Sequence, residues 1–247
     1  MSRLNIKHDA RKTFDIVKAG GIAIFPVDVG YTMISGSREG LNKIFNAKQR
    51  GGHKRNALIC DLETQRELHV LDSRGQEMVD VITQDYNLPL GPIATYRQDH
   101  PLMKKIDPNA LAASTAGGTL AMLVNAGPFH AEITRLSREE VHPLFGSSAN
   151  LTGTGTKFRV EDIQPELTSI ADVIIDYGLR KYHMYRRSAT LINFETMQVV
   201  RMGVCYEQIS DILRRHYKIE LPPDQSVEAN PSGHTDEFGL PVVVPEG

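Results

Sequence analysis

Short apolar runs alternate with stretches of helical spacing along most of the chain. The runs that suit buried strands lie at residues 22–25, 57–60, 92–96, 120–124, 144–146, 173–176, 189–194 and 198–201. The segments predicted to be helices lie at residues 9–19, 38–47, 64–71, 76–85, 130–141 and 206–217. A chain that mixes strands and helices in this way is expected to form an α/β or α+β domain around a largely buried sheet.

Particular residues mark where the predicted elements begin and end. Asp9 is the predicted N-cap of the first helix, and a glycine pair after residue 19 ends it. Pro26 is expected to close the first strand. The last helix is amphipathic, and its predicted inward-facing residues are Ile209, Ile212 and Leu213.

The composition changes after residue 218, so we divide the chain into a domain at 1–218 and an extension at 219–247. Proline and glycine are frequent in residues 222–247. A segment of this kind is expected to be flexible or draped over the domain. The apolar run at 242–244 would anchor the extension either to the domain or to the second subunit of a homodimer.

Composition narrows the function classes. The 247 residues are 40% hydrophobic and 23% charged, with a formal net charge of −2. This balance argues against a protein coated in positive charge for non-specific nucleic-acid binding. The two cysteines form no CxxC pair, which excludes a disulfide framework and a cysteine-rich zinc site. Because the N-terminus is polar and no apolar run approaches the ~20 residues of a membrane span, we expect a cytoplasmic protein with no membrane partner.

The segment after the first strand is the first candidate for chemistry. A strand that breaks at Pro26 into a glycine-containing loop places Asp28 and Tyr31 at the edge of the sheet. Ligands bind at such edges in open sheets. The same residues also suit an ordinary strand-to-loop turn.

A basic segment follows the helix at 38–47. Within eight positions it holds Lys48, Arg50, His53, Lys54 and Arg55. Lysine and arginine are the usual neutralisers of a polyphosphate, and arginine adds a planar fork for paired contacts. The alternative is a solvated basic helix end, which the helix dipole favours.

Residues 146–153 combine small side chains with hydroxyls and an amide. The small residues allow a ligand to approach the backbone closely, and Ser147, Ser148 and Asn150 supply directional hydrogen bonds. A Ser/Asn/Gly turn is the alternative.

Arginines near strand ends form the fourth candidate. Arg186 and Arg187 shortly precede Thr190 in the segment 186–190. Arg201 follows the next predicted strand and lies two residues before Gly203. A cation held at a strand end can reach a phosphate or a carboxylate, although a surface salt bridge is the commoner fate of an arginine.

The sequence lacks the motifs of several other kinds of functional site. The chain has no HxxxH or HExxH spacing, so we predict no metal site. It has no GxSxG elbow for a serine nucleophile, no GxxxxGK[ST] P-loop, and no GxGxxG after a strand for a dinucleotide.

The order of these segments resembles the YrdC-like family of threonylcarbamoyl-adenylate synthases. Members show a Gly-Gly strand leading into Pro-Thr-x-Thr-x-Tyr-Gly, then Lys-x-Arg, Asn-Pro-Leu, Pro-Gly-Pro, Ser-Ala-Asn-x-Ser-Gly, Ser-Thr and Arg-x-Gly. The matching positions are Gly20, Gly21, Pro26, Tyr31, Lys48, Arg50, Asn56, Ala57, Leu58, Gly91, Pro92, Ser148, Ala149, Asn150, Gly153, Thr190, Arg201 and Gly203. The resemblance implies a YrdC-like twisted mixed sheet with flanking helices around a concave basic site.

The resemblance also implies an activity. The family makes an adenylate from ATP, bicarbonate and L-threonine, releases pyrophosphate, and so feeds the threonylcarbamoyl modification of adenosine in transfer RNA. ATP with Mg²⁺ is therefore the expected substrate complex, and Lys48 and Arg50 are the expected catalytic residues that hold its phosphates. The nucleotide would be bound by these two residues together with Ser147, Ser148, Asn150, Thr190 and Arg201. Attack on the α-phosphate needs positioning and neutralised charge more than a protein nucleophile.

The chain departs from the family pattern at the substrate pocket, which we assign to Val27, Asp28, Val29, Tyr31 and Asn125. The two valines replace the threonines of Pro-Thr-x-Thr, and Asn125 stands where the family has an arginine. Each missing hydroxyl hydrogen bond is expected to cost about 1–3 kcal/mol of discrimination between substrates. We therefore expect a retained phosphate end and a rebuilt amino-acid end.

Three functions remain open from the sequence. The first is an enzyme that forms a carbamoyl-type adenylate, with threonylcarbamoyl-AMP as the family product. The second is a divergent enzyme of the same fold that acts on a different amine, acid or carbamoyl donor. The third is a non-catalytic RNA- or nucleotide-binding protein, in which the basic segments 48–55 and 180–187 contact the phosphates of transfer RNA or double-stranded RNA.

Overall fold

A single mixed sheet organises the chain in the computed structural model, which describes residues 4–48, 55–112 and 114–235. The strand order is β10-β9-β4-β6-β3-β7-β2-β1-β8, with β5 paired to β6. The strands are β1 (Ile22–Val27), β2 (Gly30–Ser35), β3 (Ala57–Ile59), β4 (Gly91–Thr95), β5 (Thr115–Ala116), β6 (Thr119–Leu123), β7 (Phe145–Ser148), β8 (Val173–Ile174), β9 (Leu191–Asn193) and β10 (Val199–Arg201). Three pairs are parallel (β1 with β8, β3 with β6, β4 with β9) and the others in the sheet are antiparallel, so the expected mixed α+β sheet is confirmed.

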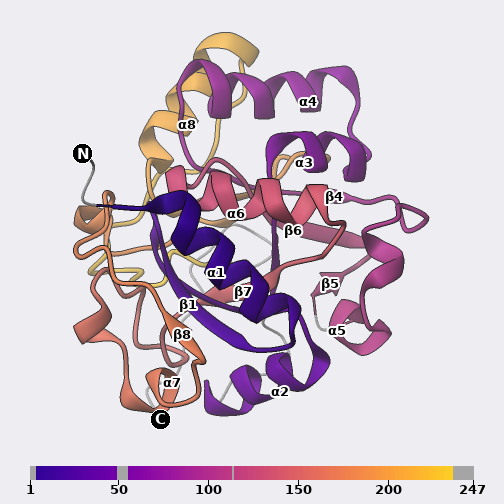
Figure 1. Cartoon of the computed structure of the whole chain (residues 1–247). Helices are drawn as coiled ribbons and strands as arrows, with labels where there is room; N and C mark the ends of the chain where they lie inside the picture. The colour runs from indigo at the N-terminus through magenta and orange to yellow at the C-terminus, as the bar shows by residue number, and fades with distance from the viewer. Residues whose placement is uncertain (1–3, 49–54, 113, 236–247) are drawn as a thin grey trace.

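Helices flank this sheet on both faces (Figure 1). The α-helices are α1 (Ile6–Lys18), α2 (Arg38–Ala47), α3 (Leu62–Leu68), α4 (Ser73–Asp80), α5 (Pro108–Ala112), α6 (Pro128–Glu139), α7 (Pro165–Thr168) and α8 (Tyr206–Ile212). Short 3₁₀ turns are η2 (Met103–Lys105), η3 (Val160–Asp162) and η4 (His183–Tyr185). The π-helical turns η1 (Val81–Asp85) and η5 (Leu213–Tyr217) directly continue α4 and α8.

Strand β1 is buried on both faces because it separates two apolar cores. Ala23, Phe25 and Val27 belong to the larger core, while Ile22 and Ile24 belong to a smaller one. This alternation follows from the two-residue period of a strand. A continuous apolar run is what a strand covered by helices on both faces requires.

Helices α1 and α6 lie side by side over the face of the larger core (Figure 1). Phe25 of β1 stacks on Phe129 of α6, with 5.1 Å between ring centroids. Arg11 and Lys18 of α1 reach Glu140 at the C-terminal cap of α6, at 2.5 and 2.7 Å. The apolar stack carries most of this contact's stability, since exposed ion pairs contribute little.

Two predicted boundaries are wrong near the N-terminus, one in helix α1 and one in the β1–β2 hairpin. Helix α1 begins at Ile6 with Asn5 as its N-cap, so Asp9 lies inside the helix rather than capping it. Pro26 lies within β1 and pairs with Tyr31, and β2 follows where no strand was predicted. Proline is tolerated there because β8 pairs only as far as Ile24, so no hydrogen-bond ladder needs an N–H from residue 26 on that side.

Other predicted helices exist with shifted ends. Asp61 and Asp72 cap α3 and α4 by accepting hydrogen bonds from the backbone N–H groups of Thr64 and Gly75, so both helices begin earlier than predicted. Helix α6 begins at Pro128 rather than 130. The predicted inward face of the last helix is confirmed, since Ile209, Ile212 and Leu213 are buried.

The described part of the extension, residues 219–235, packs on the domain. The side chain of Arg187 is 3% exposed and donates to Asp224 Oδ1 at 2.8 Å and to the carbonyl oxygens of Gln225 and Asn230, each at 2.6 Å. Further on, the Thr235 N–H donates to the Val200 carbonyl of β10 at 3.2 Å. Residues 219–235 are therefore draped over the domain, which was one of the two expectations for the extension. The 242–244 run lies outside the described residues.

None of the helices in the described ranges is both long and apolar enough to cross a membrane.

Candidate functional site

Lys48 ends helix α2 and turns its side chain inward. Ser37 caps the start of α2 by accepting from the Gly40 N–H at 3.0 Å, and Lys48 is the C-cap residue. Its side chain is only 3% exposed. The ammonium donates to Ser147 Oγ at 2.9 Å and to the Ser148 carbonyl oxygen. The solvated helix end considered from the sequence is therefore wrong for Lys48.

The structure describes only one of the other basic residues predicted to act beside Lys48. Arg50, His53 and Lys54 lie outside the described residues. Arg55 is described and exposed. The prediction that Lys48 and Arg50 act together on phosphates thus stays a prediction.

The loop after β7 folds around the Lys48 ammonium. Ser148 Oγ donates to Asn150 Oδ1, and the Asn150 amide donates to the Leu151 carbonyl at 2.6 Å. The backbone N–H of Thr152 reaches back to the Lys48 carbonyl at 3.3 Å. Ser147, Ser148 and Asn150 are therefore brought to one place with Lys48, from segments about a hundred residues apart.

Tyr31 joins this loop to a second segment. Its carbonyl accepts from the Ala149 N–H at 2.8 Å, and its hydroxyl lies 3.0 Å from Asp176 Oδ1, the Gly178 carbonyl and the Tyr177 N–H. Burial, aided by the Asp176 carboxylate, raises the pKa of Tyr31 to about 12. The hydroxyl therefore stays protonated near neutral pH and acts as a fixed hydrogen-bonding group rather than a base.

Asp28 is the centre of a partly buried charge cluster. Its two carboxylate oxygens lie 3.8 Å from Arg180 and 3.8 Å from Lys181. Burial raises the pKa of Asp28, and the charges of Lys181 and Arg180 oppose that rise. Sequence reasoning did not bring these two cations to this turn, because the pairing joins residues about 150 positions apart and leaves no local pattern.

Backbone contacts hold the same two segments together. Arg180 Nε donates to the Val27 carbonyl at 3.1 Å, and the Tyr182 N–H donates to the Asp28 carbonyl at 3.1 Å. Gly127, at φ +101°, lies so close to the Asp28 carboxylate that a Cβ atom would clash with it. Glycine is needed there for both its backbone angle and its lack of a side chain.

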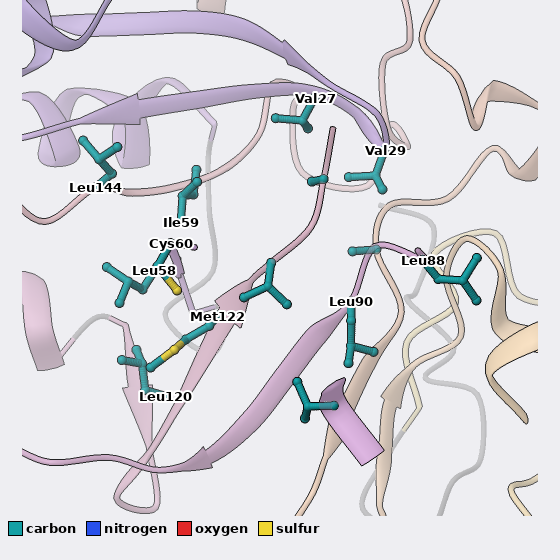
Figure 2. Close-up of a cluster of buried hydrophobic side chains, with 14 of the residues drawn as sticks. Val27, Val29, Leu58, Ile59, Cys60, Leu88, Leu90, Leu120, Met122 and Leu144 are labelled. Carbon is teal, nitrogen blue, oxygen red and sulfur yellow. The ribbon is translucent and has the colours of Figure 1, made fainter. Parts of the chain in front are cut away.

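The remaining residues assigned to the substrate pocket contact other parts of the protein. Val27 and Val29 are 3% and 2% exposed and point into a buried cluster with Leu88 and Leu90, as Figure 2 shows. The amide of Asn125 donates to the Thr83 and Leu88 carbonyls at 2.9 and 3.0 Å and to Asn87 Oδ1 at 3.1 Å. The residues predicted for the pocket thus lie in three surroundings: around Asp28 and Tyr31, within the core, and against the 83–88 segment.

Thr190 and Arg201 lie together in a different part of the sheet. Thr190 is fully buried, donates to the Val204 carbonyl at 2.9 Å and accepts from the Gly203 N–H at 3.1 Å. Arg201 Nε donates to the Ala189 carbonyl at 2.8 Å. Strands β4, β6 and β3 separate β9 from β7 in the sheet, so the predicted nucleotide residues form two groups.

The cations of segment 180–187 face acidic partners. Arg180 and Lys181 lie near Asp28, Arg186 pairs with Glu228 at 2.6 Å, and Arg187 pairs with Asp224. Cations already paired within the protein have less to offer an RNA phosphate.

The side chains of histidine, cysteine, aspartate and glutamate are the candidates for a metal site. Within the described ranges, no three such side chains lie close enough together to hold a metal ion.

Comparisons with known proteins agree with this architecture. Residues 15–203 match the model of the Sua5_yciO_yrdC family, whose description reads "Telomere recombination". No curated protein sequence matches the chain.

Solved structures share the fold. A hypothetical protein from Streptococcus mutans UA159 superposes with a TM-score of 0.68 at 20% identity, over 85% of this chain and 92% of that one. P. abyssi Sua5 complexed with L-threonine gives 0.69 at 17% identity over 97% of this chain, which spans 65% of that protein. Full-length HypF in a phosphate- and nucleotide-bound form gives 0.59 at 19% identity, over 81% of this chain and 29% of HypF.

Proposed function

The chain belongs to the Sua5_yciO_yrdC family, and from that premise we propose that it is an enzyme that binds ATP and forms a carbamoyl-type adenylate. Threonylcarbamoyl-AMP is the first product to test, because P. abyssi Sua5, which shares the fold, has been solved with L-threonine. Mg²⁺ would enter as part of the ATP substrate complex.

The observation that carries the proposal is the buried Lys48 ammonium beside the 147–150 loop. Its charge is fixed by a hydroxyl and a carbonyl oxygen rather than left mobile in water. A preorganised cation in a site of low dielectric stabilises developing negative charge far better than one in solvent. The serine hydroxyls and the asparagine amide around it supply directional contacts for a nucleotide.

The proposed step moves one bond at phosphorus. An oxygen of the carbamate acid attacks the α-phosphorus of ATP and forms the new P–O bond. The bond from that phosphorus to the bridging oxygen of the pyrophosphate breaks, and pyrophosphate leaves with the bonding electron pair. Lys48 would hold negative phosphate oxygens during this exchange, which needs alignment and charge neutralisation rather than a protein nucleophile.

A second candidate is an enzyme of the same fold that uses another amine, acid or carbamoyl donor. This candidate is favoured by the residues at the predicted pocket. Val27 and Val29 offer no hydroxyl to a substrate, and the amide of Asn125 is bonded to the 83–88 segment. The phosphate chemistry would be the same, and the acceptor would differ.

The test is pyrophosphate release from ATP with Mg²⁺ and bicarbonate across a panel of amino acids and other small amines and acids. Mass spectrometry then identifies any adenylate. Threonine-dependent release supports the first candidate, and release with another compound alone supports the second.

A matched pair of variants on helix α2 tests the role of Lys48. Lys48→Met keeps the length of the side chain but removes its charge, and turnover should fall by at least about 100-fold, the scale for losing one preorganised donor. Lys43→Met removes an exposed charge that pairs with Glu39 on the same helix, and turnover should persist. Full activity of a folded Lys48→Met protein would refute the site assignment.

A further inference from the structure

A surface cavity of about 460 Å³, open to solvent and lined mostly by exposed side chains, lies between the helical segments 73–86 and 206–217. It is lined by Glu77, Val81, Asp85, Tyr86, His216 and Tyr217. Helices α4 and α8 lie near each other at the top of Figure 1, and Arg74 of α4 donates to the Tyr217 carbonyl at 2.8 Å. The cavity therefore has walls from two elements that a direct hydrogen bond holds together.

Both walls end in π-helical turns. In η1 the Tyr86 N–H donates to the Val81 carbonyl five residues back, at 3.1 Å, and η5 continues α8 in the same way. A π turn inserts one residue, re-aims the side chains after it, and is frequent at functional sites. Here Tyr86, directly after η1, and His216 and Tyr217, within η5, are among the side chains that line the cavity.

The polar groups of the cavity favour a positive charge. Glu77 and Asp85 contribute two exposed carboxylates. Burial, reinforced by the Glu77 and Asp85 carboxylates, raises the pKa of Tyr217, and the charge of Arg74 opposes that rise.

Nearby cations are already engaged. Arg214 and Arg215 both pair with Asp211, and the Arg74 guanidinium lies at the Tyr217 carbonyl. The aromatic walls are fixed by a 2.8 Å hydrogen bond between the Tyr86 hydroxyl and His216 Nε2. Aromatic faces beside carboxylates are the usual surroundings of a bound ammonium or guanidinium group.

We propose that this cavity is a binding site for a cationic group, an ammonium or a guanidinium, held by Glu77 and Asp85 between the rings of Tyr86 and Tyr217. The site is independent of the proposed adenylate chemistry, because it shares none of its residues. The group would come from a free polyamine or from a lysine or arginine side chain of a peptide.

Calorimetric titration of the full chain at low salt tests the proposal. The probes are spermidine, N-acetyl-arginine amide and a short lysine peptide, with N-acetyl-citrulline amide as the uncharged match of the arginine probe. We expect saturable binding of at least one cationic probe, and at least tenfold weaker binding of citrulline. Preference for spermidine would indicate a polyamine as the source, and preference for the arginine or lysine probes would indicate a side chain.

Paired variants separate a site from a general charge effect. Glu77→Gln with Asp85→Asn should weaken binding at least tenfold, while Glu161→Gln with Asp162→Asn changes the net charge equally on a distant turn and should leave binding unchanged. Thermal unfolding of both proteins checks that each is folded. The proposal is overturned if no cation binds, if citrulline binds as well as arginine, or if both double variants bind alike.

Discussion

The two ends of the proposed site differ in how their polar groups are used. At the phosphate end, Lys48, Ser147, Ser148 and Asn150 converge from two distant segments into one hydrogen-bonded group. At the proposed acceptor end, Val27 and Val29 lie in the core and Asn125 is bonded to the 83–88 segment. If the proposed roles are right, the charge-binding end is kept while the specificity end has become part of the scaffold.

Two buried histidines that bond to strand β6, next to β3 in the sheet, provide the largest expected effect. Leu120 and Leu123 of β6 offer carbonyl oxygens to His69 Nε2 at 2.9 Å and His130 Nε2 at 3.0 Å. Burial lowers the pKa of each histidine to about 4. In the unfolded chain these groups titrate near 6.5, so the unfolded state binds protons that the native state refuses between pH 6.5 and 4.

The free energy of unfolding should therefore fall as pH drops through that window, by roughly 3 kcal/mol per histidine, and level off below it. Urea unfolding at a series of pH values measures this slope. His69→Gln should make the slope shallower, whereas His8→Gln, which changes an exposed histidine of α1, should not. An unchanged slope in His69→Gln would contradict the assignment of this slope to the buried histidines.

Restoring the family's threonines would sharpen the contrast at the acceptor end. Val27→Thr with Val29→Thr places two hydroxyls among apolar neighbours, and each is expected to lower the free energy of unfolding by about 1–3 kcal/mol. Chemical denaturation measures the decrease. Val70→Thr, at a valine that is 47% exposed, is the control and should cost little.

Unaltered stability of that double variant, together with a gain in threonine-dependent turnover, would mean that these positions face a ligand in solution. Our view of the acceptor end as scaffold would then be wrong.

The smallest expected effect lies at the junction of the two ends. Tyr31→Phe removes the hydroxyl that joins β2 to the 176–178 segment, and should lower the free energy of unfolding by about 1 kcal/mol. Hydrogen exchange gives the local readout, because the Tyr177 amide loses its acceptor and should exchange faster. The Ile175 amide, which donates to the Ile24 carbonyl at 2.9 Å, is the internal control. Equal protection of both amides would show that the hydroxyl does not hold the segment.

The sequence predicts most of the fold because the signals for it are local. The apolar run at β1 and the helical spacing of α2 are visible within ten residues, and both elements are where the pattern predicts them. Strand β2 escapes prediction because Gly30, Tyr31 and Thr32 suggest a loop. It becomes a strand only because β1 and β7 supply partners on both sides.

The candidate site is predicted less completely, because its contacts join residues that are far apart in the sequence. Lys48 is found because it follows a helix and matches a short motif. Its inward orientation depends on the carbonyl of Ser148, a hundred residues away. The Asp28 cluster with Arg180 and Lys181 has no local pattern at all, so only the folded chain reveals it.

The buried guanidinium of Arg187 has a practical consequence for anyone who shortens this protein. Its acceptors, Asp224 and the carbonyls of Gln225 and Asn230, all lie beyond residue 218. A shortened version ending at 218 would leave a charged side chain in the interior with no counterpart, and such a change destabilises a protein by several kcal/mol. Expression of the domain should therefore retain residues up to at least 235, and purification tags belong beyond that point.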